Sequence, residues 1–149
     1  MSGPVHVDEL DRRIMDALRE DGRASNSAIA AQLGVTEGTV RQRTRRLFDS
    51  GVFKVVGLAN PEIMPDHQVG VIGLKVKESR QLESCAEQVR ALPEVRSVSI
   101  VTGRYDLLVE VLVPHNQGLI QFLSGSLASV SGVQSTETFL LLKTLDKWI

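Results

Sequence analysis

Apolar residues recur at helical spacing in the first part of the chain. Leu10, Ile14 and Leu18 fall on one face of a helix. The residues at 8–11 include three acids, which suit the positive end of a helix dipole. The pattern predicts a first helix over residues 8–20.

Two shorter helical patterns follow, separated by a tight turn. The first is expected to begin at an N-cap, Ser25 or Asn26, and to end at Gly34. The second is expected to begin after Thr36, a further N-cap residue, and to end at Ser50-Gly51. The residues predicted to face inward are Ile29, Ala30 and Leu33 in the first helix and Val40, Thr44 and Leu47 in the second.

The chain changes character after the third helix. Val52 to Val56 is a short apolar run typical of a β-segment, which we expect to form a wing or a hinge. Asn60-Pro61 to Pro65-Asp66 is rich in residues that break regular structure. The sequence therefore predicts a winged helix-turn-helix domain over residues 1–57, a linker over 58–66 and a second domain over 67–149.

In the second domain the apolar spacing becomes strand-like. The order of predicted elements is strand, helix, strand, strand, helix, strand, which is that of a ferredoxin-like α+β fold. Because both helices would cover one face of the sheet, apolar residues on the other face indicate that a second copy packs there. The predicted strands are 69–76, 95–102, 106–113 and 133–142, and the predicted helices are 82–92 and 119–130.

The third helix has a basic outward face. On a helical wheel Gly38, Arg41, Gln42 and Arg45 lie almost opposite the apolar residues. Arginine can bind guanine through two hydrogen bonds, and glutamine can bind adenine in the same way. A run of charge is most often a solvated helix face, but here it follows a second helix, a glycine turn and a threonine cap. The sequence therefore predicts contacts with double-stranded DNA from Thr36, Gly38, Thr39, Arg41, Gln42, Arg43, Arg45 and Arg46.

Two of these arginines are compatible with either of two roles. Arg43 and Arg46 fall on the flanks of the outward face, where they suit either phosphates or intramolecular pairs. Both alternatives are open from the sequence.

The composition narrows the classes of function. With 42% hydrophobic residues the chain of 149 residues is expected to fold, and a net charge of −1 leaves DNA binding to a local basic patch. The single cysteine, Cys85, excludes an intrachain disulfide and fits a buried apolar position. His6, His67 and His115 are scattered, so we expect no metal site and no cofactor. No apolar run is long enough to span a membrane, which favours a cytoplasmic, nucleoid-associated protein.

Several runs of residues form a specific combined pattern. In the first domain they are residues 7–14, 21–25, 33–36, 40–47 and 51–52, and in the second they are Thr102 to Asp106 followed by 107–111. Together they resemble the Lrp/AsnC family of feast/famine transcription regulators, with departures at Ala28, Thr44 and Val55-Val56. The resemblance implies a transcription regulator that binds a palindromic operator and an amino-acid-like effector. It also implies a homodimer formed through facing sheets and commonly assembled into an octamer.

The same resemblance implies an effector site on the turn before the third strand and on the last strand. Asp106 can pair with an ammonium group, and Arg104 or the backbone around Gly103 can bind a carboxylate. Each residue also has a plain structural role, since Gly103 can form the hairpin and Asp106 can cap it. The implied effector residues are Thr102, Gly103, Arg104, Tyr105, Asp106, Thr136 and Thr138.

Two other classes of function compete with a regulator. Tetrapyrrole decarboxylases of the sirohaem branch resemble these regulators in both domains, but their helix-turn-helix need not stay basic. A ligand-binding module alone would explain residues 67–149 and leave residues 1–57 without a purpose. The sequence has no Ser-His-Asp or Cys-His pairing and no phosphate-binding glycine loop, so we expect no enzyme.

Overall fold

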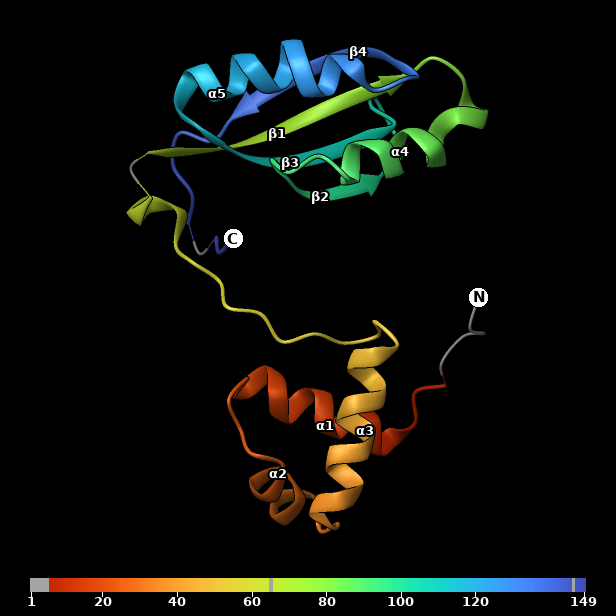
Figure 1. Cartoon of the computed structure of the whole chain (residues 1–149), viewed down its shortest axis with the longest axis vertical. Helices are drawn as coiled ribbons and strands as arrows, with labels where there is room; N and C mark the ends of the chain where they lie inside the picture. Colours follow the sequence, from red (N-terminus) through yellow and green to blue (C-terminus); the bar gives the residue numbers. More distant parts are fainter. Residues whose placement is uncertain (1–5, 65, 146) are drawn as a thin grey trace. The chain divides into compact units, whose positions relative to one another are not determined.

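The computed structural model describes residues 6–64, 66–145 and 147–149. The chain divides into two compact units, which we call the N-terminal unit (Met1–Gly57) and the C-terminal unit (Leu58–Ile149) (Figure 1). Within the described residues no helix is both long and apolar enough to cross a membrane.

The N-terminal unit consists of three helices whose ends are set by local capping. Helix α1 (Glu9–Glu20) follows Asp8, whose carboxylate accepts the backbone N–H of Asp11 at 2.9 Å. The Asp11 carboxylate in turn accepts the N–H of Asp8 at 3.0 Å, which completes a capping box. The first predicted helix is thus confirmed, and Asp8 is its N-cap.

The next two helices also begin and end where their caps predict. Helix α2 (Asn26–Leu33) has Ser25 as its N-cap, and Gly34 ends it with a φ of 70°. Helix α3 (Glu37–Asp49) has Thr36 as its N-cap. The buried residues that join the three helices are Ile14, Ala17, Leu18, Ile29, Ala30 and Val40.

The predicted β-wing is absent from this structure. Residues 53–60 form no regular secondary structure, although Phe53 packs against the core and stacks on Phe48 with ring centroids 6.1 Å apart. A strand needs a partner for its backbone hydrogen bonds, and no neighbouring segment of the N-terminal unit provides one among the described residues. The prediction of a β-segment over Val52 to Val56 was therefore wrong for the single chain.

The C-terminal unit is built on a four-stranded sheet in the order β2-β3-β1-β4. Every neighbouring pair is antiparallel, as the ferredoxin-like pattern predicts. The turn expected between the second and third strands does connect β2 to β3. The strands are β1 (His67–Val76), β2 (Val95–Ile100), β3 (Leu107–Pro114) and β4 (Val133–Leu140).

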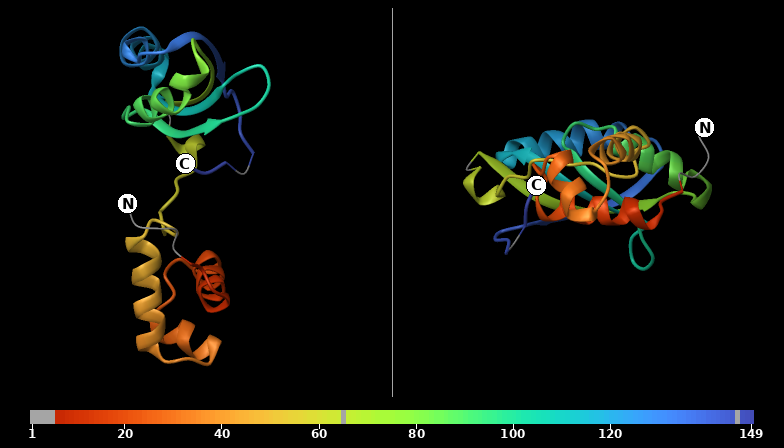
Figure 2. Two further views of the ribbon diagram at one scale, coloured as in Figure 1. Left: turned by 90° about the vertical axis from the view of Figure 1, so that its right-hand side faces the viewer. Right: turned by 90° about the horizontal axis from the view of Figure 1, so that it is seen from below.

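Two helical segments cover one face of this sheet (Figures 1 and 2). Helix α4 (Leu82–Arg90) follows the turn η2 (Ser79–Gln81) and contributes the buried Cys85. The second segment was predicted as one helix over 119–130. It instead begins earlier and changes its winding along its length, passing through α5 (His115–Gln121), the π-helical η3 (Phe122–Ser126) and the 3-10 turn η4 (Leu127–Ser129).

The opposite face of the sheet is partly covered by the unit's own C-terminal residues. Lys147 Nζ lies 2.6 Å from Oε2 of Glu110, a residue of β3 that alternates with the buried Val109 and Val111. Ile149 pairs with Ala59, the N–H of each donating to the carbonyl of the other at 3.1 and 2.8 Å. Part of the segment proposed as a linker is therefore held against the end of the chain.

Tyr105 lies on this same face, directly over Gly73 of β1. A Cβ placed on Gly73 would lie 2.6 Å from Cγ of the Tyr105 ring, so the ring rests on bare backbone. Gly73 alternates with Ile72 and Leu74, which point into the core under the helices. The missing side chain is thus what lets Tyr105 pack here.

Replacing Gly73 by alanine should displace the Tyr105 ring. We expect Gly73→Ala to destabilise the C-terminal unit by about 1 to 3 kcal/mol, because the added methyl group overpacks the contact. Urea unfolding followed by Trp148 fluorescence measures the change. Gly125→Ala is the matched control, since a Cβ there meets nothing within 4 Å, and it should shift stability by less than about 1 kcal/mol. Equal effects of the two variants would contradict the packing described for Gly73.

Candidate nucleic-acid interface and ligand-binding turn

Helix α3 presents an exposed face that carries the predicted base-reading residues. Gly38, Arg41, Gln42 and Arg45 are all exposed, whereas Val40 and Leu47 are fully buried on the other side of the helix. A Cβ on Gly38 would meet nothing closer than 4.0 Å, so the backbone is open at this point. The helical wheel drawn from the sequence therefore gave the correct outward face.

The start of α3 is fixed by two threonines. Thr36 Oγ1 accepts the backbone N–H of Thr39 at 3.2 Å, and the two hydroxyl oxygens lie 2.9 Å apart. Each hydroxyl keeps further hydrogen-bonding capacity toward solvent. The pair lies in the first turn of α3, ahead of Arg41.

Among the described residues, the ion pairs of Arg41 and Arg45 are exposed ones within their own helix. Arg41 pairs with Glu37, and Arg45 Nε lies 3.4 Å from Asp49 Oδ2. The Arg45 side chain is 83% exposed. Exposed pairs of this kind contribute little free energy, so both guanidinium groups can exchange their partner for another anion.

Arg43 and Arg46 have a different environment and point back to α1. Arg43 Nη1 lies 2.6 and 2.7 Å from the two carboxylate oxygens of Asp8 and 3.1 Å from Asp11 Oδ1. Arg46 donates to the other oxygen of Asp11. Of the two roles that the sequence left open for these arginines, intramolecular pairing is the one the structure forms.

Asp11 is the buried centre of this group of charges. It is fully buried, and Asp8 and Arg43 are partly exposed beside it. The hydrogen bond from Arg43 and the backbone N–H of Asp11 hold the pKa of Asp8 well below its usual range. The same carboxylates raise the pKa of Arg43. The group of Asp8, Asp11, Arg43 and Arg46, here called the α1–α3 charge cluster, fixes α3 on α1.

Thr44 is an unusual residue on the inward side of α3. Its Oγ1 is buried and has no hydrogen-bond partner in the described part of the chain. The position agrees with the sequence prediction that Thr44 faces inward. An unpaired buried hydroxyl lowers the stability of the packing between helices.

The second candidate site is the turn between β2 and β3. Gly103 has a φ of 113°, which a residue with a side chain rarely adopts. The guanidinium of Arg104 lies over the Tyr105 ring at 5.5 Å from its centroid, and its Nη2 is 3.1 Å from Glu137 Oε2. Thr102, Gly103 and Arg104 are exposed, so the turn presents its polar groups outward.

Glu137 of β4 is a member of this site that the sequence reasoning missed. The Tyr105 hydroxyl donates to Glu137 Oε2, which raises the pKa of Tyr105 because the hydrogen bond favours the neutral phenol. The Tyr105 ring also meets Phe139 edge to face at 6.3 Å. The available signal was that Glu137, between two threonines, is the one charged residue of β4.

Asp106 is tied to the neighbouring strand β1. Its Oδ2 accepts the backbone N–H of Val76 at 2.8 Å, and its backbone N–H donates to the carbonyl of Leu74 at 2.8 Å. Its other oxygen, Oδ1, lies 3.8 Å from Nζ of Lys75. Asp106 thus closes the turn with one oxygen and keeps a partly exposed carboxylate.

The two predicted threonines lie on the other face of the sheet. Thr136 and Thr138 pair with Leu74 and Ile72, whose side chains point toward the helices. Tyr105 and Glu137 lie on the opposite face. The single chain therefore brings Arg104, Tyr105 and Glu137 together, and it does not add the threonine side chains to that group.

Among the described residues no group of three or more histidine, cysteine, aspartate or glutamate side chains could hold a metal ion. Cys85 of α4 is buried, and burial raises the pKa of its thiol.

Comparisons with known proteins identify both halves of the chain. The model of the AsnC-type helix-turn-helix domain matches residues 7–47, and that of the Lrp/AsnC ligand binding domain matches residues 70–147. The HTH-type transcriptional regulator FL11 of Pyrococcus abyssi is 34% identical over 141 residues, which are 94% of this chain and 92% of that protein. These similarities give no support to the tetrapyrrole decarboxylase alternative.

Solved structures agree on the fold. The leucine response regulatory protein LrpA of Mycobacterium tuberculosis matches with a TM-score of 0.82 at 24% identity, covering 94% of this chain and 95% of that chain. A transcriptional regulator of Neisseria meningitidis, solved as a complex with L-Met, matches with a TM-score of 0.73 at 24% identity. It covers 95% of this chain and 94% of that chain. Both matches include the helix-turn-helix and the α+β unit.

The α1–α3 charge cluster predicts a pH dependence of stability. The pKa of Asp8 is lower in the folded state than in the unfolded state. Ionised Asp8 therefore contributes fully to the free energy of unfolding at pH values above the unfolded pKa of about 3.9, and this contribution is lost as the pH falls below that value. We expect the stability difference between wild type and Asp8→Asn to shrink between pH 5 and pH 2. Urea unfolding followed by NMR of the Ile14 and Ile29 methyl groups reports on this unit. A difference that stays constant with pH would contradict the pairing of Asp8 with Arg43.

Proposed function

The chain belongs to the Lrp/AsnC family of transcriptional regulators, and from that premise we propose how it binds its operator and its effector. Helix α3 enters the major groove with Gly38, Arg41, Gln42 and Arg45 toward the base edges. The observation that carries this proposal is the division of the arginines of α3. Arg41 and Arg45 are exposed in weak surface pairs, and Arg43 and Arg46 are occupied by α1.

The remaining polar groups of the helix-turn-helix have supporting roles in this proposal. Thr36 and Thr39, at the start of α3, donate to backbone phosphates. Arg43 and Arg46 orient α3 through the α1–α3 charge cluster and stay paired with their carboxylates. Glu37 and Asp49 release their arginines when the DNA binds.

We propose that the regulator binds a palindromic site as a homodimer. The sheet face that carries Tyr105 and Phe139 retains exposed apolar surface, with Phe139 43% exposed. Packing of two such faces would bury that surface and place two α3 helices on two half-sites. Further assembly of dimers into an octamer is the arrangement that the family resemblance implies.

The effector in this proposal is an amino acid bound at the turn between β2 and β3. Oδ1 of the partly exposed Asp106 carboxylate exchanges Lys75 for the ammonium group, and Arg104 pairs with the carboxylate after leaving Glu137. Thr136 and Thr138 contribute only where the edge of β4 meets another subunit, because in one chain they face away from Tyr105. The matched domain model is described as ligand binding, and one fold neighbour was solved with L-Met.

The DNA-binding proposal predicts different effects for two neighbouring arginines. Arg45→Ala should weaken binding to a selected operator by about 1 to 3 kcal/mol and leave stability unchanged, because only an exposed pair is lost. Arg43→Ala should instead lower stability, because it leaves Asp11 with one partner fewer. Operator binding is measured by fluorescence anisotropy on a duplex selected from random DNA, and stability by urea unfolding.

Arg19→Ala is the control, since Arg19 is an exposed arginine in a pair with Asp16 on α1. It should change neither quantity. The affinity of the wild-type dimer for the operator should also fall as the salt concentration rises, because binding of the positive helix face releases counterions from the DNA. No selected site, or an unchanged affinity for Arg45→Ala, would refute the assigned face.

The effector proposal predicts that a substitution of Asp106 removes the response to the amino acid and leaves basal DNA binding intact. Asp106→Asn should abolish the change in operator affinity caused by the responsive amino acid, found by screening L-Met and the other common amino acids. It should leave basal DNA binding intact, because an amide oxygen still accepts the N–H of Val76. Asp106→Ala should also destabilise the C-terminal unit by about 1 kcal/mol. A normal response in both variants would place the effector elsewhere.

A further inference from the structure

The first turn of helix α3 carries an acid on a surface that otherwise suits DNA. Glu37 is the first residue of α3, and its side chain is exposed. In a helix-turn-helix the N-terminal residues of the recognition helix contact the base edges. A carboxylate at this place is repelled by the phosphates of a bound duplex. Its position therefore calls for a favourable contact that offsets this repulsion.

Glu37 forms an ion pair with Arg41, one turn further along the helix. The Glu37 side chain is 47% exposed and that of Arg41 66%. Because four residues separate them, the two side chains are neighbours on the helix surface. The residue between them in the first turn is Gly38, where a Cβ would meet nothing closer than 4.0 Å. The pair thus presents guanidinium donors and a carboxylate acceptor side by side on an open surface.

The neighbouring acids of the N-terminal unit have different surroundings. Asp8 and Asp11 are bound within the α1–α3 charge cluster. Asp49 pairs with Arg45, but it is the last residue of α3. The C-terminal end of a recognition helix lies away from the bases that its first turns contact. Glu37 is therefore the acid of α3 that is placed to reach a base edge.

The ion pair matches the groups that one kind of base pair offers in the major groove. Across a G·C pair these are two acceptors, guanine N7 and O6, followed by a donor, cytosine N4–H. Two guanidinium donors beside a carboxylate acceptor are complementary to that order. An A·T pair instead offers acceptor, donor and acceptor, so the carboxylate would face the O4 of thymine. A G·C pair in one of its two orientations satisfies all three groups.

The exchange of the ion pair for such a base pair costs little free energy, because exposed ion pairs are weak. On a G·C pair Arg41 replaces a carboxylate by guanine acceptors, and Glu37 replaces a guanidinium by the amino group of cytosine. On an A·T pair Glu37 gives up its partner and meets another acceptor. The acid therefore opposes binding to the wrong sequence, which is how a repulsive group adds specificity.

We propose that Glu37 and Arg41 together read one G·C base pair in each half-site of the operator. Glu37 accepts the N4–H of cytosine, and Arg41 donates to N7 and O6 of the paired guanine. The inference rests on the proposed entry of α3 into the major groove and adds the base pair that its first turn recognises. Glu37 is then a specificity-determining residue, and its charge lowers the affinity for other sequences.

Removing single atoms from the DNA tests the two contacts. In the operator selected from random DNA, each cytosine of one half-site is replaced in turn by an analogue without the 4-amino group, and binding is followed by fluorescence anisotropy. At one position this change should weaken binding of the wild-type protein about tenfold, and it should not weaken binding of Glu37→Ala. Placing 7-deazaguanine opposite the same cytosine should weaken the wild type about tenfold and leave Arg41→Ala unaffected.

Asp49→Ala is the matched control, because it also removes an acid that pairs with an arginine of α3. Both Glu37→Ala and Asp49→Ala should bind an unselected duplex more tightly than the wild type, since each removes a negative charge near the DNA. Asp49→Ala should keep the wild-type loss at the cytosine analogue. If Glu37 served only the helix dipole, Glu37→Ala would lower stability and keep that loss as well, which would overturn the proposal.

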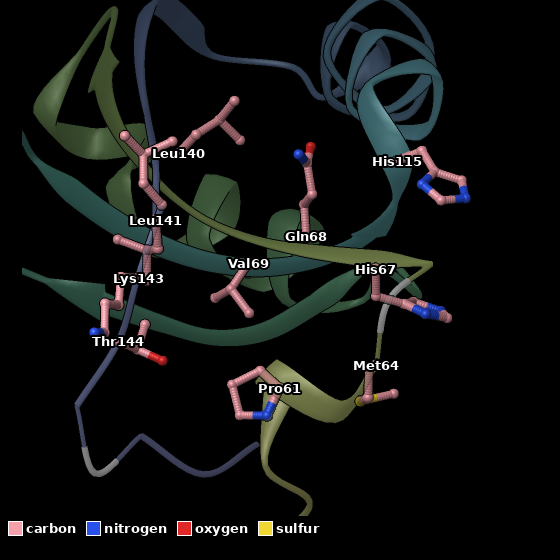
Figure 3. A pocket seen from close by; sticks show the side chains of 11 residues that line it. Pro61, Met64, His67, Gln68, Val69, His115, Leu140, Leu141, Lys143 and Thr144 are labelled. Atoms are coloured by element: carbon pink, nitrogen blue, oxygen red, sulfur yellow. The ribbon is translucent and has the colours of Figure 1, made fainter.

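Each result is a ratio of two affinities measured on one preparation of the full-length protein. The C-terminal unit has a cleft of about 340 Å³ at the start of β1, lined by Val69, His115 and Lys143 among others (Figure 3). A small molecule retained there would change the affinity for every duplex by the same factor, so its effect cancels in the ratio. An unfolded fraction of a variant cancels in the same way.

Arg45→Ala, measured on the same duplexes, separates this inference from the proposed DNA binding. If Arg45→Ala weakens binding but Glu37→Ala keeps the wild-type loss at every cytosine analogue, the inference is overturned and the position of α3 in the groove stands. The inference is also overturned if the selected half-site has no G·C pair, or if the two analogues act at different base pairs. If no site is selected, both proposals fail.

Discussion

A single buried carboxylate governs the arrangement of the N-terminal unit. Asp11 is fully buried, so its charge must be matched within the protein. It is matched by Arg43 and Arg46, which lie 32 and 35 residues further along the chain. Because these two side chains must turn toward α1, Arg41 and Arg45 must turn away from it. The exposed face of α3 is therefore determined by the ion pairs that Arg43 and Arg46 form with Asp11 on the opposite side of the same helix.

The parts of this unit that the sequence predicted are those that depend on neighbouring residues. Ser25, Thr36 and Gly34 cap their helices through contacts within four residues, so their identity alone marks the helix ends. The role of Arg43 depends on a partner far away in sequence, so helical spacing left it undecided. The β-segment at 52–56 was wrong for a related reason, since a strand propensity becomes a strand only where another backbone lies beside it.

In the C-terminal unit, alternation of apolar residues was enough to predict the strands and their ferredoxin-like order. It was not enough to predict which side chains meet on the other face of the sheet. Tyr105, Gly73 and Glu137 come from three segments and meet only because β1 lies beside β4 and one position on β1 has no side chain. The family resemblance pointed to the turn at 102–106 and grouped Thr136 and Thr138 with it. The strict alternation of a strand places them on the other face.

The pairing of Ala59 with Ile149 joins the two ends of the C-terminal unit. A residue next to its start and its last residue meet through two backbone hydrogen bonds, so the two ends of the unit lie close together. The helix-turn-helix could therefore be joined to either end of the ligand-binding unit without changing the point of attachment. A circularly permuted gene could attach the helix-turn-helix after Ile149 and deliver it to the same point on the ligand-binding unit.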